Sequence, residues 1–360
     1  MSPAWNEPEA INAVLEGCPQ HIRGPVDAYV VDQKNSRHLA ISSDYISATQ
    51  AFPGEDVRSL VRRGLIEAIS DLAAVGAEFH GVQIDLRAPG SFDYADFHAV
   101  GQGVQDVLVE HGGYLLQASN MSRGEFGVSN TVIGTIDDCT PMTRAGARSG
   151  DQVFISGPTG GWNSALALLN YAGADLSESE WILVRDDFVD YRPELEFGQA
   201  LAASGLVSAC TDANDGLDKC LRDLVRPLGL SADIDETMVP LSNSALLAER
   251  EMGVQPHALA IMGLAGDNRL IFTAAASHES LLGDVAASFG RELYRIGTVR
   301  HGNGVVSYRE LHGRTTASDI RSNEIYHQSF SAPIILRPNR FGASGIVLGP
   351  QYSPSETGFA

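Results

Sequence analysis

Long apolar runs are missing from this chain of 360 residues. No stretch approaches the roughly 18–20 apolar residues that a membrane-spanning helix needs. The first residues, Met-Ser-Pro-Ala-Trp-Asn-Glu, have no basic segment followed by an apolar one, so no secretory signal is expected. Cysteine is also scarce, and the four cysteines form no CxxC pair. The simplest interpretation is a cytoplasmic protein with reduced thiols.

Basic residues are few relative to acidic ones. The chain has 25 Lys and Arg against 45 Asp and Glu, which gives a formal net charge of −20. This charge argues against nucleic acid and anionic membranes as partners. If the protein binds a nucleotide, divalent cations are expected to neutralise much of the phosphate charge.

Several common catalytic motifs are absent. The turn 157–161 is rich in glycine but lacks the Gly-Lys-Ser/Thr of a Walker loop, so a tight turn is the better interpretation. No Gly-x-Ser-x-Gly elbow is present, and the histidines show no metal-ligand spacing. Arg123, Arg144 and Arg148 lie in predicted loops, where phosphate clamps and solvated side chains are equally good interpretations.

The hydrophobic patterns predict an α+β protein in two domains. We place a domain boundary near residue 148, with domains at 1–148 and 149–310 and a partly mobile tail at 311–360. Segment 176–190 is interpreted as a loop or an exposed helix, and 121–127 as a loop between strands. Strands are predicted at 28–31, 37–43, 80–86, 114–117, 129–136, 152–156, 232–234, 270–273 and 294–299. Helices are predicted at 8–16, up to residue 75, and at 94–111, 162–171, 194–204, 211–227 and 279–289.

One predicted helix carries an acidic residue near its C-terminal end. Its apolar residues recur at three- and four-residue spacing from Val57 to Leu72, and Gly76 fits a C-terminal cap. Asp71 lies within about a turn of that end, where the helix dipole favours cations. Taken alone, Asp71 is best interpreted as a solvated surface residue.

Other aspartates stand at the ends of predicted elements. Asp44 closes a strand, Asp212 and Asp215 begin a helix, and Asp27 precedes the first strand. Each alone is more simply a turn or capping residue. If they converge with Asp71, however, they would repel one another unless they shared cations. Several carboxylates in one place, with phosphate and water as further ligands, are typical of a Mg²⁺ site.

Four stretches resemble motifs of a known family. Ser42-Ser43-Asp44 is similar to a Thr-Thr-Asp motif, and 70–77 is similar to a Ser-Asp-x-Ala-Ala-Met-Gly-Ala helix. Residues 144–157 resemble an Arg-Ser-Gly-Ala-x-Pro-Gly-Asp segment and its strand, and 212–217 resembles Asp-x-Ser-Asp-Gly-Leu. Together they resemble thiamine-monophosphate kinases, a branch of the superfamily of aminoimidazole ribonucleotide synthetase and selenophosphate synthetase. The resemblance covers about residues 24–300.

The chain departs from the family pattern at several positions. Val26-Asp27 stands where the family has two aspartates, and Asn120 stands where it has an Asp. Asn214 replaces a Ser, and Asn268-Arg269 replaces Tyr-Glu. These changes favour an unusual acceptor, or altered or lost chemistry.

The resemblance implies a fold and an assembly. The sheet of the N-terminal domain would pair with that of a second subunit to form a barrel in a homodimer, with ATP bound in the groove between. The C-terminal domain would be an α/β sandwich. The implied activity is ATP- and Mg²⁺-dependent phosphotransfer to a small-molecule acceptor. Two alternatives stay open: activation of an amide or carboxylate oxygen by ATP, and a non-catalytic nucleotide-binding relative.

The resemblance also implies residue roles. The implied metal ligands are Asp27, Asp44, Asp71, Asp212 and Asp215, of which Asp71, Asp212 and Asp215 are also the implied catalytic residues. The implied nucleotide-binding residues are Ser43, Asn120, Ser122, Arg123, Gly124, Arg144 and Asn214.

Overall fold

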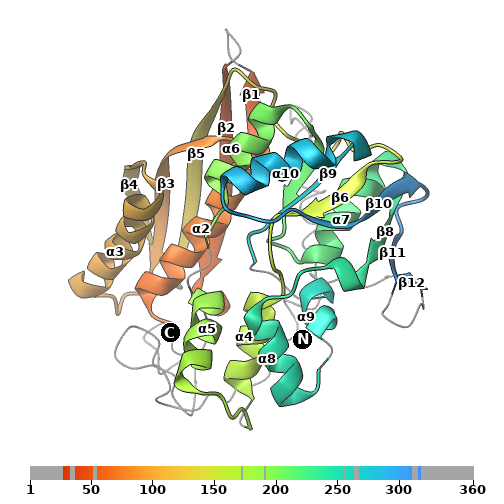
Figure 1. Ribbon diagram of the computed structural model, residues 1–360. Helices are drawn as coiled ribbons and strands as arrows, with labels where there is room; N and C mark the ends of the chain where they lie inside the picture. Colours follow the sequence, from red (N-terminus) through yellow and green to blue (C-terminus); the bar gives the residue numbers. More distant parts are fainter. Residues whose placement is uncertain are drawn as a thin grey trace.

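The computed structural model describes residues 27–32, 37–51, 55–171, 173–189, 192–254, 256–262, 267–309 and 315–317. Two sheets lie side by side, and helices pack against both of them (Figure 1). This arrangement confirms the predicted α+β class. Among the described helices, none is both long enough and apolar enough to cross a membrane.

The first sheet has five strands in the order β1-β2-β5-β3-β4. They are β1 (Tyr29–Asp32), β2 (Arg37–Ser47), β5 (Gly127–Asp137), β3 (Glu78–Ala88) and β4 (Tyr114–Arg123). β2 and β5 pair antiparallel along their whole length, whereas β3 and β4 run parallel. The described strands form an open sheet with edges at β1 and β4, so this chain by itself contains no closed barrel. The barrel across a dimer stays a prediction.

Helices cover one face of this sheet. α2 (Val57–Val75) packs against β2 and β5, and α3 (Tyr94–His111) packs against α2 and β4. Asp56 caps the start of α2 by accepting a hydrogen bond from Ser59 N at 2.7 Å. Gly76 ends the helix in the left-handed conformation, with φ of 81°. The predicted end of this helix is confirmed.

The second sheet has seven strands in the order β12-β11-β8-β10-β6-β9-β7. They are β12 (Thr315–Ala317), β11 (Val306–Arg309), β8 (Leu230–Asp235), β10 (Tyr294–His301), β6 (Gln152–Ile155), β9 (Leu270–Ala274) and β7 (Val207–Asp212). Phe154 and Phe272 face a core shared with α6 (Leu195–Ser204) and α10 (Glu279–Ser288). The opposite face packs against α7 (Leu217–Val225). The sheet is therefore a layer between helices.

A group of helices adjoins the second sheet at one end (Figure 1). It comprises α4 (Gly161–Asn170), α5 (Glu178–Val189), α8 (Asn243–Met252) and α9 (Pro256–Met262). α4 contacts each of the other three. Its first turn is fixed by Asp267, which accepts hydrogen bonds from Thr159 Oγ1 and Gly160 N, both at 2.6 Å. The glycine-rich segment 157–161 is therefore a turn that leads into α4, in agreement with its interpretation as a tight turn.

Some predicted boundaries are wrong. β2 continues to Ser47, so Asp44 lies inside the strand rather than at its end. β4 continues through Arg123, so the first part of the predicted loop 121–127 is strand. α7 begins at Leu217 rather than near Thr211, and Asp212 ends a strand, β7, that was not predicted.

Other predictions fall at the margins of the described chain. The helix expected at 8–16 lies outside the described residues, as does most of the tail at 311–360. Within that tail, Thr315–Ala317 forms the edge strand β12. The domain boundary near 148 lies between β5 and β6 and stays a prediction.

Candidate metal and nucleotide site

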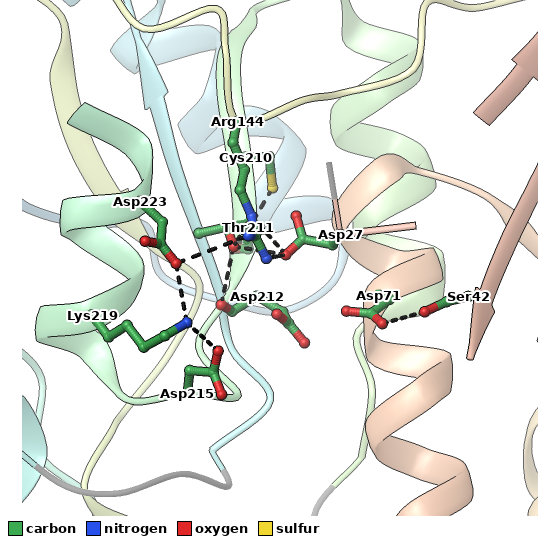
Figure 2. A network of polar contacts seen from close by, with 10 residues as sticks. All are labelled: Asp27, Ser42, Asp71, Arg144, Cys210, Thr211, Asp212, Asp215, Lys219 and Asp223. Atoms are coloured by element: carbon green, nitrogen blue, oxygen red, sulfur yellow. Dashed lines mark hydrogen bonds and ion pairs between the residues drawn. The ribbon is translucent and has the colours of Figure 1, made fainter. Parts of the chain in front are cut away.

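Three carboxylates meet where the two sheets adjoin. Asp27 precedes β1, Asp71 lies in the last turns of α2, and Asp212 is the last residue of β7. One carboxylate oxygen from each of the three lies within 4.8 Å of the others. Figure 2 shows the three side chains directed toward a common space. Residues almost 200 positions apart in the sequence thus form one cluster.

These carboxylates have little solvent to stabilise their charge. The Asp27 side chain is 1% exposed, and Asp212 is 3% exposed. Within the described part of the chain, Oδ2 of each is buried and accepts no hydrogen bond. Asp71 accepts a hydrogen bond from the Ser42 hydroxyl. Buried oxygens without a donor are costly unless another group, such as a cation, satisfies them.

The electrostatics of the cluster favour a bound proton or cation. Burial raises the pKa of Asp71 well above its ordinary value, and the nearby Asp212 and Asp27 raise it further. Burial, and then Asp27, raise the pKa of Asp212 to about 8. The pKa of Asp27 is also raised, chiefly by burial, although Arg144 opposes this. A divalent cation would relieve the repulsion that holds these protons.

Arg144 is fixed against one member of the cluster. Its guanidinium donates to Asp27 Oδ1 through Nε at 3.0 Å and through Nη2, and Nε also donates to Thr211 Oγ1 at 3.2 Å. Thr211 Oγ1 in turn donates to the same oxygen of Asp27 at 2.9 Å. Arg144 and Thr211 therefore leave Oδ2 of Asp27 as the oxygen directed to the cluster.

Asp215 differs from the other candidate ligands. Its side chain is 46% exposed and pairs with Lys219, whose Nζ also lies 3.1 Å from Asp223 Oδ2. It lies outside the group of three but close enough to Asp212 to raise its pKa. Asn214 is half-buried in the same loop between β7 and α7. Lys219 was not identified from the sequence. The only signal for it was its four-residue spacing from Asp215, which is common on exposed helices.

Asp44 lies beside the group of three. Side chains alternate along β2, so Asp44 faces α2 together with Ser42. It is close enough to raise the pKa of both Asp71 and Glu67. Asp44 therefore belongs to the same acidic region, although it does not join the closest three carboxylates.

The predicted nucleotide-binding residues other than Arg144 and Asn214 lie on β2, on β4 or directly after β4. Ser43 points to the opposite face of the sheet from Ser42, and its hydroxyl lies 3.1 Å from that of Thr131. Asn120 donates to Asp85 Oδ1 at 2.7 Å. The contacts of Ser43 and Asn120 are therefore with residues other than the three clustered carboxylates.

The next three residues continue along the edge strand. Ser122 and Arg123 are exposed on β4. Gly124 follows, with the Arg87 side chain directly against its Cα, where a Cβ would come within 2.0 Å of Arg87 Nε. Their roles stay predictions, as do those of Ser43 and Asn120.

The donor set fits Mg²⁺. All three clustered groups offer carboxylate oxygens, which are the hard ligands that Mg²⁺ prefers. Oδ2 of Asp27 and Oδ2 of Asp212 are buried and accept no hydrogen bond in the described structure. A bound cation would satisfy both oxygens, so they support the fit of this site to Mg²⁺. The fold and this cluster define the class: a two-sheet α+β protein with an acidic cluster at the junction between its sheets.

Comparison with known proteins agrees with this class. Residues 25–136 match the family described as AIR synthase related protein, N-terminal domain. The chain is 28% identical to the thiamine-monophosphate kinase of Methanopyrus kandleri, over 86% of this chain and 94% of the relative. It is 27% identical to that of Escherichia coli K12, over 61% of this chain and 66% of the relative.

Solved structures show the same fold. A thiamine-monophosphate kinase from Stenotrophomonas maltophilia superposes with a TM-score of 0.67 at 25% identity, covering 83% of this chain and 94% of that one. A structure of AaThiL complexed with AMPPCP and TMP has a TM-score of 0.72 at 19% identity, covering 88% and 99%. Residues 25–136 therefore form an AIR synthase related N-terminal domain, and the chain as a whole is similar to thiamine-monophosphate kinases.

Proposed function

We propose that this protein is an ATP- and Mg²⁺-dependent kinase for a small molecule, with thiamine monophosphate as the first acceptor to test. The observation that carries the proposal is the convergence of the Asp27, Asp71 and Asp212 carboxylates, of which the Asp27 and Asp212 side chains are almost fully buried. The acceptor is suggested by the relatives named thiamine-monophosphate kinase. The departures from the family pattern at Asn120 and Asn268 are compatible with an acceptor related to thiamine monophosphate.

Each residue near the cluster has a proposed task. Asp27, Asp71 and Asp212 would hold Mg²⁺, which, when bound, neutralises phosphate charge and orients the nucleotide for in-line transfer. Ser42 holds the Asp71 carboxylate by a hydrogen bond. Arg144 and Thr211 hold Asp27 and leave its second oxygen available. The protein thus contributes mainly positioning and electrostatics.

A homodimer is part of the proposal. β4 is an edge strand of the open sheet and carries exposed apolar side chains: Tyr114, Leu115, Leu116 and Met121. Exposed apolar residues on a sheet edge favour pairing with another chain. Ser43, Asn120 and Arg123 lie on the same open face or edge, so a nucleotide site completed by a partner is consistent with their positions.

Product analysis tests the activity. The full chain is incubated with Mg²⁺, ATP and thiamine monophosphate, and the products are identified by mass spectrometry. The proposal expects ADP and thiamine diphosphate in equal amounts. ADP and free phosphate without a phosphorylated product would instead support activation of an amide or carboxylate. Absence of Mg²⁺-dependent ATP binding by calorimetry would contradict the proposal and favour a non-catalytic relative.

A further inference from the structure

Lys219 is a rare residue type in this chain and lies beside the carboxylate cluster. Of the 25 Lys and Arg residues, two are lysines, Lys34 and Lys219, and Lys34 lies outside the described residues. Scarcity alone identifies no site. It makes the choice of an ammonium at this position notable, because an ammonium is a compact point charge, whereas a guanidinium is a broad planar fork.

Lys219 stands where its own helix disfavours a positive charge. It is the third residue of α7, and the helix dipole favours anions in the first turn. The N-cap residue, Gly216, has no side chain to accept hydrogen bonds from the first N–H groups of the helix. The ammonium and these N–H groups therefore attract an anion to the same end of α7.

Two carboxylates contact the Lys219 ammonium. Nζ donates to Asp215 and lies 3.1 Å from Asp223 Oδ2. Burial alone would lower the pKa of Lys219, but Asp215 and Asp223 outweigh it and raise the pKa, so the ammonium stays charged. An ammonium has three N–H donors, so the two contacts that the described structure shows leave one donor for a ligand.

The partners of Lys219 can be solvated by water when the ammonium turns to a ligand. The side chains of Asp215 and Asp223 are 46% and 36% exposed, and an exposed ion pair contributes little to stability. Arg144 is different, because its partner Asp27 is 1% exposed and would be left as a buried charge. Lys219 can therefore exchange a carboxylate for a phosphate oxygen, whereas Arg144 stays with Asp27.

Lys219 is connected to the carboxylate cluster through both of its partners. Asp215 is close enough to Asp212 to raise its pKa, and Asp223 Oδ2 lies 3.9 Å from Nη1 of Arg144, which is itself hydrogen-bonded to the cluster. Figure 2 shows positive and negative groups alternating here, with the Lys219 ammonium between Asp215 and Asp223. A phosphate group on this side of the cluster would meet an ammonium with a donor available.

We propose that Lys219 binds a phosphate group of a substrate and adds a fixed positive charge to the site of the proposed kinase. The inference rests on the proposed function, because that function brings phosphate groups to the cluster. In a chain with a net charge of −20, a built-in cation reduces the repulsion that a phosphate meets. The phosphate belongs either to the nucleotide or to a phosphorylated acceptor, and separate titrations distinguish these sources.

Calorimetric titration of the full chain tests the inference without measuring activity. The ligands are a non-hydrolysable ATP analogue with Mg²⁺, thiamine monophosphate, and thiamine, which lacks the phosphate group. Lys219→Met removes the charge but keeps a long side chain. We expect it to weaken binding of the ATP analogue or of thiamine monophosphate at least about tenfold, with thiamine binding unchanged. A loss confined to the ATP analogue assigns Lys219 to the nucleotide, and one confined to thiamine monophosphate assigns it to the acceptor.

Two further variants serve as controls for this titration. Arg226→Met removes an equal charge from the exposed C-terminal end of the same helix, so it should bind every ligand as the wild type does. Lys219→Arg keeps the positive charge, so it should bind the affected ligand more tightly than Lys219→Met does.

A double variant separates direct contact from charge. Without the ammonium, Asp215 and Asp223 would repel a phosphate by their own charge. Lys219→Met combined with Asp223→Asn restores the local net charge but not the N–H donor. We expect the double variant to bind the affected ligand at least about fivefold more weakly than the wild type. Recovery of wild-type affinity would show that Lys219 only neutralises carboxylates, and would overturn the inference.

Failure of this inference is distinguishable from failure of the proposed function. If the wild type binds both phosphate ligands and Lys219→Met binds them equally well, the role of Lys219 is refuted and the proposed kinase stands. An equal loss in Arg226→Met would also refute it, because a general change of charge would then explain the effect. If the wild type binds neither phosphate ligand, the proposed function and this inference are both contradicted.

Discussion

Asp71 shows how much a residue's environment changes its interpretation. From the sequence alone it is a surface carboxylate at an unfavourable helix end. In the structure it faces Asp27 and Asp212 at the junction of the two sheets, and burial raises its pKa. The carboxylates were predictable as candidates because of their types and positions. Their convergence was not, because it depends on how β1, α2 and β7 pack.

The raised pKa values predict a pH dependence of stability. A carboxylate whose pKa is higher in the folded state stabilises the protein at low pH, and this contribution is lost as pH rises through the folded pKa. With Asp212 at about 8, the metal-free protein should lose stability between about pH 4 and pH 8. The slope is at most about 1.4 kcal/mol per pH unit for each proton.

Urea denaturation at several pH values, in a chelator and in Mg²⁺, measures this effect. Mg²⁺ should flatten the slope, since it binds the deprotonated carboxylates. Asp212→Asn should reduce the slope in the chelator. If the wild type and Asp212→Asn show equal slopes without metal, the raised pKa of Asp212 is refuted.

Among the elements, α2 connects the two halves of the molecule. It packs against β2 and β5 of the first sheet and against α6 and β7 of the second half. Its final glycine is in close contact with α6, because a Cβ at Gly76 would lie 2.3 Å from Ala202 Cβ. The end of α2, and with it Asp71, is therefore held in place by both halves.

Gly76→Ala should destabilise the protein in two ways. An L-residue at positive φ costs about 1–2 kcal/mol, and the contact with Ala202 adds a steric cost. Gly205→Ala is the matched control, because Gly205 has φ of 63° with nothing within 4 Å of an added Cβ. Urea denaturation should show a larger loss for Gly76→Ala, about 3 kcal/mol in total. Equal losses in both variants would show that the close packing of α2 on α6 is not important for stability.

The sequence predicted long periodic elements better than short ones. The 94–111 pattern predicts a helix that the structure confirms with the same bounds, and Asp93 caps it. The strand Val207–Asp212 was missed because Ser, Ala and Cys give no clear alternation. Residues 121–123 were predicted as the start of a Gly-containing loop, yet they continue an exposed edge strand where polar residues are tolerated.

For the molecule as a whole, the acidic charge is consistent with the proposed dependence on divalent cations. The net charge of −20 repels ATP unless metal ions accompany it. The barrel and the homodimer stay predictions, since an open sheet has the same strand pattern whether or not a partner completes it. The exposed apolar residues of β4 provide the physical argument for a partner.

Leu116→Asp tests the partner surface. Leu116 is 52% exposed on β4, and a charge there should weaken an apolar interface and give a monomer in analytical ultracentrifugation. Leu281→Asp on α10 is the matched control, because Leu281 is also 52% exposed but lies far from β4 in sequence and on the other sheet's helices. A wild-type chain that is already monomeric, or equal effects of both substitutions, would contradict the proposed dimer surface.

The most direct test of the account is ATP turnover by Asp71→Asn. This substitution removes one carboxylate from the cluster without changing the shape of the side chain, and it relieves repulsion, so the variant should be folded and at least as stable as the wild type without metal. Asp106→Asn is the control, because Asp106 pairs with Arg58 at 2.6 Å, between α3 and α2. We predict that Asp71→Asn lowers Mg²⁺-dependent turnover at least about 10²–10³-fold, while Asp106→Asn keeps it. Wild-type turnover by Asp71→Asn would contradict the proposed metal site.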